Sequence, residues 1–595
     1  MRPAKLLAVA IVLAACSRKP PPPPKEGPGS GSAVIATPAP SDAAVAPVYR
    51  TKESGDHLDD KVAGTGKTFM VVSEAEQASK VGKDILASGG NAVDAAIATV
   101  FALAVVHPTA GNLGGGGFAV IRVAPGKALA LDFRETAPGA ATADMFLGKD
   151  GKPTKASLVG HKASGVPGSV AGMWALHQKL GKKPWKELLE PAITLARDGF
   201  TIDEHTHQAI VSRAARLLEF PKTGEIWVPN RVPRETGATV TIPLLAVALE
   251  RIRDSGADGF YKGETAAAIA AEMKAGEGLI TLEDLAKYQA VWRDPIRVAY
   301  RGRSIITMPP PSSGGIVLAM TAGMLEGKEL GAVEWHGPEH VHRLVEVWRR
   351  AFAARNELLG DPAFVKDMPI AKLTSKAYLD ALAATITPGA TPSKDVAAII
   401  EGNHTTNLCV VDGAGMAVAI TTTLNTAWGS GVTVHGFLMN NEMDDFSAKP
   451  GSPNVFGLVQ GVANKIEPGK RMLSSMSPTI VEDAKGEVEL VVGAQGGPRI
   501  ITAVWQTLSN AIDFKRNAAA AVAAPRIHHQ HLPDKVFVEG DSISKETDAK
   551  LKEIGYTLEF SALAREFGAS NAIERTSKGW EGAADPRGGG AAMGD

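Results

Sequence analysis

A threonine stands where a β-strand begins in the stretch 402–412, which reads Gly402-Asn-His-Thr-Thr-Asn-Leu-Cys-Val-Val-Asp412. Residues alternate there and β-branched side chains are frequent, which predicts a strand that starts at Thr405. The turn at 412–415 then predicts a hairpin, whose second strand over residues 416–423 leads to Asn425. If the chain is cut just before Thr405, the threonine hydroxyl can serve as a nucleophile and its own α-amine as the base.

Polar motifs elsewhere in the chain decide whether this threonine has a chemical role. A Thr-Thr pair on a strand by itself reflects only β-propensity. Here the pair is accompanied by four further motifs, and the ordered set is far more specific than any single member. The motifs are Asp132-Phe-Arg-Glu-Thr-Ala-Pro138, Asn440-Asn-Glu-Met-Asp-Asp-Phe446, Leu473-Ser-Ser-Met-Ser-Pro478 and Gly493-Ala-Gln-Gly-Gly-Pro-Arg499.

With these motifs, the chain from about residue 69 to Arg587 resembles the γ-glutamyltranspeptidase family, most strongly over residues 405–499. That family belongs to the N-terminal nucleophile hydrolases, so the resemblance implies an α/β fold of the four-layer αββα sandwich type. Family precursors cut themselves before the catalytic threonine. The resemblance therefore implies cleavage between His404 and Thr405, into associated large (61–404) and small (405–595) subunits.

The resemblance also implies a binding site for a γ-glutamyl donor, which is a small zwitterion. Arg134 matches the arginine that binds the donor α-carboxylate, a task that suits a bidentate guanidinium. Ser474 and Ser475 match a serine pair that donates hydroxyl groups to the same carboxylate. Without the motif, the acidic residues near 442–445 would be read as a solvated loop. The positions that match the acceptors for the α-ammonium are Asn425, Glu442 and Asp445.

The catalytic roles follow from the same resemblance. The backbone N–H groups of Gly496 and Gly497 match the oxyanion hole, although a Gly-Gly pair after a strand is also an ordinary turn. Thr423 matches a threonine whose hydroxyl supports the nucleophile. The implied reaction forms a γ-glutamyl ester on Thr405 and passes the group to water or to an amino acid or dipeptide amine. Glutathione is the donor that the family suggests, and no metal or organic cofactor is implied.

Three departures from the family pattern concern the surroundings of the nucleophile. Asn407 stands where the family usually has His, and Cys409 stands where it often has Ser. On an alternating strand, residues 405, 407 and 409 share one face, so rate and self-processing are open to change. Phe456 replaces a tyrosine in a segment that resembles the family's lid loop.

Other functions are compatible with parts of this pattern. A related acylase, such as one that acts on glutaryl-cephalosporins, would not need Asn425, Glu442 and Asp445 together. An uncleaved, inactive homologue that binds ligands at the cell surface is suggested by Asn407. A structural envelope protein with the same fold is a further alternative, which no feature of the sequence requires.

The elements around these motifs show both periodicities of a layered α/β protein. The residues at 92–106 are apolar nearly all round, which predicts a buried helix. The glycine run at 112–118 lacks the residues of a phosphate-binding loop and indicates tight backbone packing instead. Residues 174–290 read as mainly helical, and 309–315 as a turn before a helix. The other predicted elements are strands over 70–73, 118–123, 129–133, 408–411, 417–423, 479–482 and 488–492, and helices over 75–87 and 504–512.

The N-terminus reads as a targeting segment. Two basic residues precede an apolar run at 6–13, which is too short to span a bilayer. The run ends in Leu13-Ala-Ala-Cys16, which resembles the lipobox of bacterial lipoproteins, so we expect a signal at 1–16 and lipidation of Cys16. Cleavage after Ala15 as a plain secretory signal is the alternative. Residues 17–60 read as a Pro-, Gly- and Ala-rich tether.

Bulk composition sets wide bounds on function. The chain has 595 residues, 44% of them hydrophobic, and a formal net charge of −1, which indicates a large core and no nucleic-acid partner. No Cys/His cluster suggests zinc. Of the two cysteines, Cys409 lies in an apolar strand, where a buried inert thiol is expected. The predicted location is a bacterial cell envelope, with anchoring by lipid only. Ser17 after the lipobox suits the outer membrane of a Gram-negative cell.

Overall fold

The computed structural model describes residues 49–50, 64–393, 405–452, 454, 458, 460–561 and 564–595, without the side chains of residues 564 and 565. Cys16, His404, Phe456 and the predicted signal segment lie outside the described residues. All of the described residues belong to one structural unit, which spans residues 44–595. None of the helices in the described ranges has both the length and the apolar character needed to cross a membrane.

The strand that carries Thr405 is central in a seven-stranded antiparallel sheet. β10 (Thr405–Val411) and β11 (Ala417–Thr423) pair along their full length, with Thr405 opposite Thr423. The strand order is β21-β2-β10-β11-β3-β4-β7. The remaining strands of this first sheet are β2 (Met70–Ser73), β3 (Gly116–Ala124), β4 (Lys127–Phe133), β7 (Val291–Arg293) and β21 (Ala591–Gly594).

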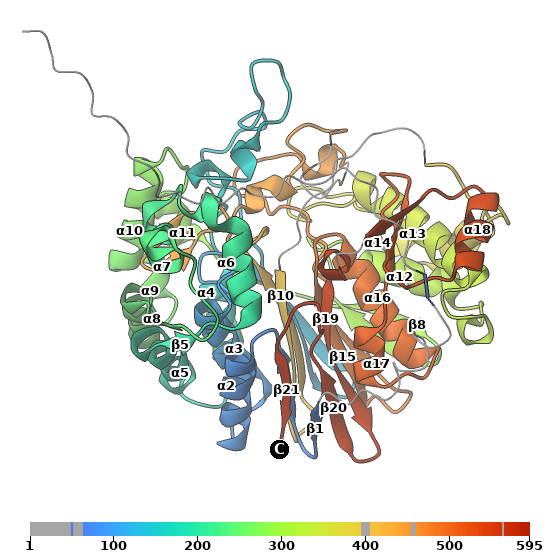
Figure 1. Ribbon diagram of the computed structural model, residues 1–595, viewed down its shortest axis with the longest axis horizontal. Coiled ribbons are helices and arrows are strands. Elements are labelled where there is room, and N and C mark those ends of the chain that lie inside the picture. Colours follow the sequence, from blue (N-terminus) through green and yellow to red (C-terminus); the bar gives the residue numbers. More distant parts are fainter. Residues whose placement is uncertain are drawn as a thin grey trace, which may run out of the picture. The chain divides into compact units, whose positions relative to one another are not determined.

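A second seven-stranded antiparallel sheet stacks on the first (Figure 1). Its strand order is β1-β20-β19-β15-β14-β9-β8. Its strands are β1 (Gly64–Gly66), β8 (Ile296–Tyr300), β9 (Arg303–Thr307), β14 (Thr479–Glu482), β15 (Val488–Gln495), β19 (Ala569–Thr576) and β20 (Gly579–Ala583). Smaller sheets contain β5 (Phe200–Thr201) with β6 (Thr239–Val240), β12 (Thr433–Val434) with β13 (Phe437–Leu438), and β16 (Ile527–His528) with β17 (Val536–Glu539) and β18 (Leu558–Ser561).

Helices cover the outer face of each sheet, which completes four layers (Figure 1). The first sheet is covered by α2 (Glu76–Ala87), α3 (Ala92–Val106), α4 (Ser169–Leu180), α5 (Trp185–Asp198), α6 (Glu204–Leu217), α7 (Pro221–Trp227), α8 (Pro243–Ser255), α9 (Asp258–Tyr261), α10 (Gly263–Ala275) and α11 (Leu282–Lys287). The second is covered by α12 (Gly314–Leu325), α13 (Pro338–Leu358), α14 (Ile370–Leu373), α15 (Lys376–Ala383), α16 (Arg499–Ile512), α17 (Ala518–Ala523) and α18 (Lys545–Glu553). The predicted αββα sandwich is confirmed.

Strand β10 is buried on both faces, which explains its apolar character. Leu408 and Val410 join the core under the first helical layer, whereas Cys409 and Val411 join the core between the sheets. Alternate residues of a strand point to opposite faces, so each layer of the sandwich uses one half of this strand. Strand β10 is therefore held from two sides.

The predicted elements agree with the structure except at their ends. The helix over 92–106 is found with every residue buried, and Asn91 and Asp94 form a capping box at its start. Strand β15 runs three residues past the predicted end, to Gln495. Helix α16 begins at Arg499, five residues before the predicted start. The unpredicted strand β1 pairs with β20 and lies before residue 69, where the resemblance to the family begins.

The glycine run at the start of β3 allows close backbone packing, as expected. A Cβ atom on Gly115 would lie 2.0 Å from the carbonyl oxygen of Thr423, and one on Gly117 would lie 2.3 Å from that of Thr421. Larger side chains would push β3 away from the end of β11. The run thus positions the end of the strand that faces Thr405.

Candidate active site

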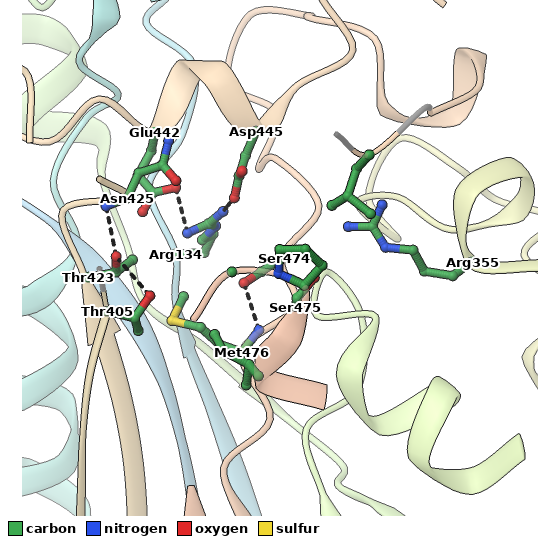
Figure 2. A pocket seen from close by; sticks show the side chains of 14 residues that line it. Arg134, Arg355, Thr405, Thr423, Asn425, Glu442, Asp445, Ser474, Ser475 and Met476 are labelled. Atoms are coloured by element: carbon green, nitrogen blue, oxygen red, sulfur yellow. Dashed lines mark hydrogen bonds and ion pairs between the residues drawn. The ribbon is translucent and has the colours of Figure 1, made fainter. Parts of the chain in front are cut away.

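Two threonine hydroxyl groups meet where the hairpin β10–β11 opens (Figure 2). The Oγ1 atoms of Thr405 and Thr423 are 3.4 Å apart. The backbone N–H of Asn425 donates to Thr423 Oγ1 at 2.7 Å. Asn425 adopts a φ of 78°, a left-handed conformation that asparagine tolerates better than most residues. This turn directs the chain from the strand end into the site.

A pocket lies at this point, with about 310 Å³ of space between its atoms, part of it open to solvent, and nearly all predicted site residues line it. All six predicted substrate-binding residues line it together with Thr405, Thr423 and Gly497, whereas Gly496, the preceding residue in the chain, is not part of the lining. These side chains come from segments up to several hundred residues apart. The lining consists of Arg134, Arg355, Thr405, Thr423, Asn425, Glu442, Asp445, Leu458, Ser474, Ser475, Met476, Gly497, Pro498 and Ile500.

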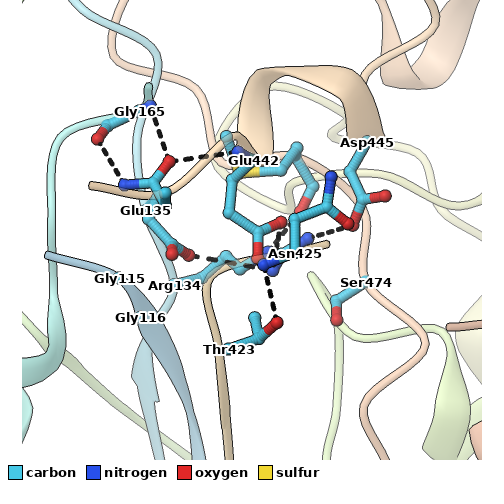
Figure 3. Close-up of polar contacts among 12 residues, drawn as sticks. Gly115, Gly116, Arg134, Glu135, Gly165, Thr423, Asn425, Glu442, Asp445 and Ser474 are labelled. Atoms are coloured by element: carbon cyan, nitrogen blue, oxygen red, sulfur yellow. Dashed lines mark hydrogen bonds and ion pairs between the residues drawn. The ribbon is translucent and has the colours of Figure 1, made fainter. Parts of the chain in front are cut away.

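Arg134 is the centre of a buried charge cluster (Figure 3). Its guanidinium contacts Glu442 Oε2 at 2.8 Å, pairs with Asp445 Oδ2, and lies 3.7 Å from Glu135 Oε2. Burial opposes the charge of Arg134, but Glu442 and Asp445 outweigh it and hold the pKa of the guanidinium above its usual range. One cation thus faces three carboxyl groups in a water-poor site.

The carboxyl groups of this buried cluster have raised pKa values. Burial raises the pKa of Glu135 to about 8, against the opposing effect of Arg134. Burial likewise raises the pKa values of Glu442 and Asp445 above their usual ranges. A positively charged ligand group would stabilise the ionised carboxylates, so the cluster suits an ammonium group.

Asn440 holds the acidic turn η5 (Glu442–Asp445) in place. Asn440 Oδ1 accepts hydrogen bonds from the backbone N–H groups of Glu442 at 3.1 Å and Gly165 at 2.8 Å. Its Nδ2 donates to the Gly114 carbonyl at 2.7 Å. The turn is therefore tied to the glycine run before β3, which explains why a predicted acidic loop is buried.

The turn before α12 holds the serine pair. The backbone N–H of Ser474 donates to the Pro311 carbonyl at 2.9 Å. Both the N–H and the hydroxyl of Ser313 donate to the Ser474 carbonyl, at 2.7 and 2.6 Å. Ser474 Oγ accepts from the Met476 N–H at 3.1 Å. The predicted turn at 309–315 thereby acts as a support for the serine loop.

The two glycines of the predicted oxyanion hole lie between β15 and α16. Gly496 and Gly497 have φ values of 129° and 55°, which few other residues adopt. The start of a helix carries partial positive charge and free N–H groups. The glycine N–H groups next to this 14-residue helix are thus suited to stabilise an oxyanion near Thr405.

Asn407 and Cys409 follow Thr405 on the face of β10 between the two sheets. Asn407 Nδ2 donates to Glu74 Oε1 at 3.1 Å, and its carbonyl accepts from Asn571 Nδ2 at 2.9 Å. Cys409 Sγ donates to the Asn571 carbonyl at 3.5 Å, and burial raises the pKa of the thiol. The expectation that Cys409 is buried and inert agrees with this environment.

Several pocket residues were not anticipated from the sequence. Arg355 lies on helix α13, which was not predicted from the sequence, and is 1% exposed, although its local sequence resembles a charged helix surface. Glu135 does not line the pocket itself but lies beside Arg134 in the motif at 132–138, and no role was predicted for it. No role was predicted for the apolar lining residues Leu458, Met476, Pro498 and Ile500 either, although Met476 and Pro498 belong to the quoted motifs. Only the fold places these residues beside Thr405.

The sandwich and the threonine at the start of its central strand define an N-terminal nucleophile hydrolase fold. The chain resembles a cephalosporin acylase from Bacillus halodurans with a TM-score of 0.78 and 26% identity, over 89% of this chain and 96% of that one. It resembles the γ-glutamyltranspeptidase of Helicobacter pylori with a TM-score of 0.52 and 42% identity, over 53% of this chain and 91% of that one.

Sequence relatives identify the family within this class. Residues 78–595 match the family described as gamma-glutamyltranspeptidase. The glutathione hydrolase proenzymes of Pseudomonas aeruginosa and Escherichia coli are each 46% identical over 531 residues, which cover 88% of this chain and 94% and 90% of those proteins. The chain belongs to the gamma-glutamyltranspeptidase family and is an enzyme.

Proposed function

We propose that the protein is a self-processing γ-glutamyltransferase and glutathione hydrolase. The observation that carries the proposal is the meeting of Thr405 with a cation, acidic groups and two serines in one cavity. Relatives named glutathione hydrolase proenzyme support both the donor and a cut precursor. The cut between His404 and Thr405 releases the α-amine of Thr405, which then serves as the base.

The donor is held by its two α-substituents. Its α-carboxylate binds to Arg134 and to the hydroxyl groups of Ser474 and Ser475. Its α-ammonium binds to Glu442 and Asp445, where it compensates the excess of acid, and to the amide oxygen of Asn425. These contacts place the γ-carbonyl carbon next to Thr405 Oγ1.

Acyl transfer follows in two steps. The α-amine of Thr405 takes the hydroxyl proton while Oγ1 attacks the γ-carbonyl carbon, and the N–H groups of Gly496 and Gly497 stabilise the oxyanion. The amide C–N bond breaks, and the leaving amine receives the proton. Water or the amine of an amino acid or peptide then attacks the γ-glutamyl ester, so that Thr405 is regenerated.

An acylase of the cephalosporin type is the second candidate, because the Bacillus halodurans acylase matches the fold over most of both chains. A glutaryl donor has a carboxylate but no α-ammonium. The buried acidic pair Glu442 and Asp445 would then lack a partner in the donor, and burial of such groups is costly. The acidic pair therefore favours γ-glutamyl over glutaryl donors.

Intact mass and N-terminal sequencing of the purified protein, beside Thr405→Ala, test self-processing. Scaling the 62.0 kDa chain by length gives fragments of about 40 kDa for residues 16–404 and about 20 kDa for residues 405–595. We expect a new N-terminus at Thr405 in the wild type and an uncut chain in the variant. A wild-type chain that stays intact would instead favour the inactive binding protein, and Asn407 would then be the first residue to test as the cause of failed cleavage.

We also propose that Cys16 anchors the protein to a bacterial envelope membrane, because it ends a lipobox-like sequence. Labelling with a radioactive fatty acid should mark the wild type and leave Cys16→Ala unlabelled. Label in the variant, or none in either protein, would refute the lipid anchor without affecting the enzymatic proposal.

A further inference from the structure

The catalytic cavity contains a second guanidinium, that of Arg355 near the end of α13 (Figure 2). We propose that Arg355 binds the donor α-carboxylate together with Arg134 and so determines specificity for donors that carry this group. The inference deepens the proposed function and rests on it. It assigns a role in donor selection to a residue that lies outside the sequence motifs of the site.

The partners of Arg355 are neutral oxygens. Its Nε donates to Ser313 Oγ at 3.2 Å, and its Nη1 donates to Asn356 Oδ1 at 3.1 Å. Among the described residues, no carboxylate oxygen lies within 4.0 Å of its side-chain nitrogens. Arg134 differs, because it already pairs with Glu442 and Asp445.

A cation buried in this way is incompletely compensated. Burial lowers the pKa of Arg355 to about 10, and only the more distant Asp445 opposes this effect. Buried charges are normally paired, because removal from water is costly. A carboxylate that enters the cavity would supply the missing pair, and its planar group matches the guanidinium fork.

The hydrogen bonds of Arg355 lead to the serine loop. Ser313, which accepts from Arg355 Nε, donates its own hydroxyl to the Ser474 carbonyl at 2.6 Å. Arg355 therefore adjoins the loop on which the donor carboxylate is expected to bind. The carboxylate of a leaving peptide is another anion, but it extends from the opposite side of the attacked γ-carbonyl.

Three anilide donors separate the possible roles of Arg355. The γ-glutamyl anilide has both α-substituents, the glutaryl anilide has only the carboxylate, and the 4-aminobutanoyl anilide has only the ammonium. Their leaving group has no carboxylate. We would compare kcat/KM for the three donors in the wild type, Arg355→Gln and Arg355→Lys, with Arg350→Gln as a control on the same helix. Arg350 pairs with Glu346 and does not line the cavity.

For Arg355→Gln we expect a loss of roughly 10- to 100-fold with both carboxylate-bearing donors, relative to the 4-aminobutanoyl anilide. Arg355→Lys should lose less, since it keeps the charge but not the fork. Ratios between donors are taken within one preparation, so partial maturation does not alter them. If Arg355→Gln does not mature, the inference is tested in Arg355→Lys, by kcat/KM for the carboxylate-bearing donors relative to the 4-aminobutanoyl anilide.

An equal loss with all three donors would overturn the inference and indicate a structural role for Arg355. No loss with the anilides but a loss with glutathione would also overturn it and indicate contact with the leaving peptide. Ser313→Ala removes the hydroxyl that links Arg355 to the serine loop. If this variant shows the same donor ratios as Arg355→Gln, then Arg355 acts by supporting the loop and does not contact the donor directly. A wild type that does not cleave the γ-glutamyl anilide would refute the proposed function itself.

Discussion

At the scale of single residues, the main feature of the site is one buried guanidinium that pairs with several carboxyl groups. Arg134 joins Glu442, Asp445 and Glu135, all of them largely removed from water. Ion pairs in such surroundings depend strongly on each partner, because an unpaired buried charge is costly. Binding and stability are therefore coupled at Arg134.

Arg134→Gln should weaken donor binding and also destabilise the protein. Removal of one partner from a buried pair costs about 3–5 kcal/mol, and here several carboxyl groups lose their cation. Urea unfolding and kinetics with a γ-glutamyl anilide measure the two effects, with Arg134→Lys as the charge-preserving control. An unchanged KM for the anilide would refute the role of Arg134 in donor binding.

Glu135 should make stability depend on pH. Burial raises its pKa from 4.5 to about 8, so the folded state holds a proton that the unfolded state loses. The contribution of Glu135 to the free energy of unfolding is thus full below pH 4.5 and is lost as the pH rises through 8.

Urea unfolding of the wild type and Glu135→Gln at pH 5 and pH 8 tests this sign. Between pH 5 and pH 8, the free energy of unfolding should fall by at least about 1 kcal/mol more in the wild type than in the variant. An equal change in the free energy of unfolding in the two proteins would show that the pKa of Glu135 is not raised in the folded state.

At the scale of elements, the β10–β11 hairpin is positioned by its neighbours on both sides. The glycine run brings β3 against β11, and Asn571 of β19 connects the second sheet to the Asn407 carbonyl. Glu74, just after β2, accepts from the Asn407 side chain. Thr405 therefore stands on a hairpin whose freedom is limited by three other strands.

Substitution of Asn407 should test this support. Asn407→Ala removes the donor to buried Glu74 and should cost about 1–3 kcal/mol. Asn407→Asp keeps the shape but places two carboxyl groups together, so it should destabilise more. Urea unfolding and the rate at which Thr405 becomes an N-terminus are the measurements. Equal stability of the Asp and Ala variants would contradict the assigned contact.

At the scale of the folded unit, both sheets combine strands from before and after residue 405. Strand β2 lies between β10 and β21 in the first sheet. In the second, β8 and β9 extend a group of four strands that come after residue 405. The hydrophobic cores are shared in the same way. The part of the chain before residue 405 and the part after it therefore complete each other's sheets with backbone hydrogen bonds.

The two fragments should consequently remain together after cleavage. We expect one elution peak in size-exclusion chromatography and a single cooperative unfolding transition, because separation would break both sheets. The residues 405–595, produced alone, should not fold. Elution of a free small fragment under native conditions would contradict this interlocked arrangement.

Sequence reasoning was most successful where local periodicity and motifs carry the information. It predicted the strand at Thr405, the buried helix at 92–106, the four-layer class and the six polar residues that line the cavity with Thr405. It was less successful at element ends, such as 495 and 499, because strand and helix limits there depend on packing. It missed Arg355 because an arginine on an amphipathic helix has the same local signal whether it is exposed or buried.

The sequence by itself determined the chemistry: a threonine at a strand start, an arginine, acidic groups, serines and paired glycines in an order typical of one family. The tertiary structure alone decided which of these groups share a cavity and how they are charged. The distances between segments hundreds of residues apart, and the burial that shifts the pKa values of Glu135 and Glu442, follow from the packing of two sheets and their helices. Such packing depends on all contacts at once, so no local stretch of sequence encodes it.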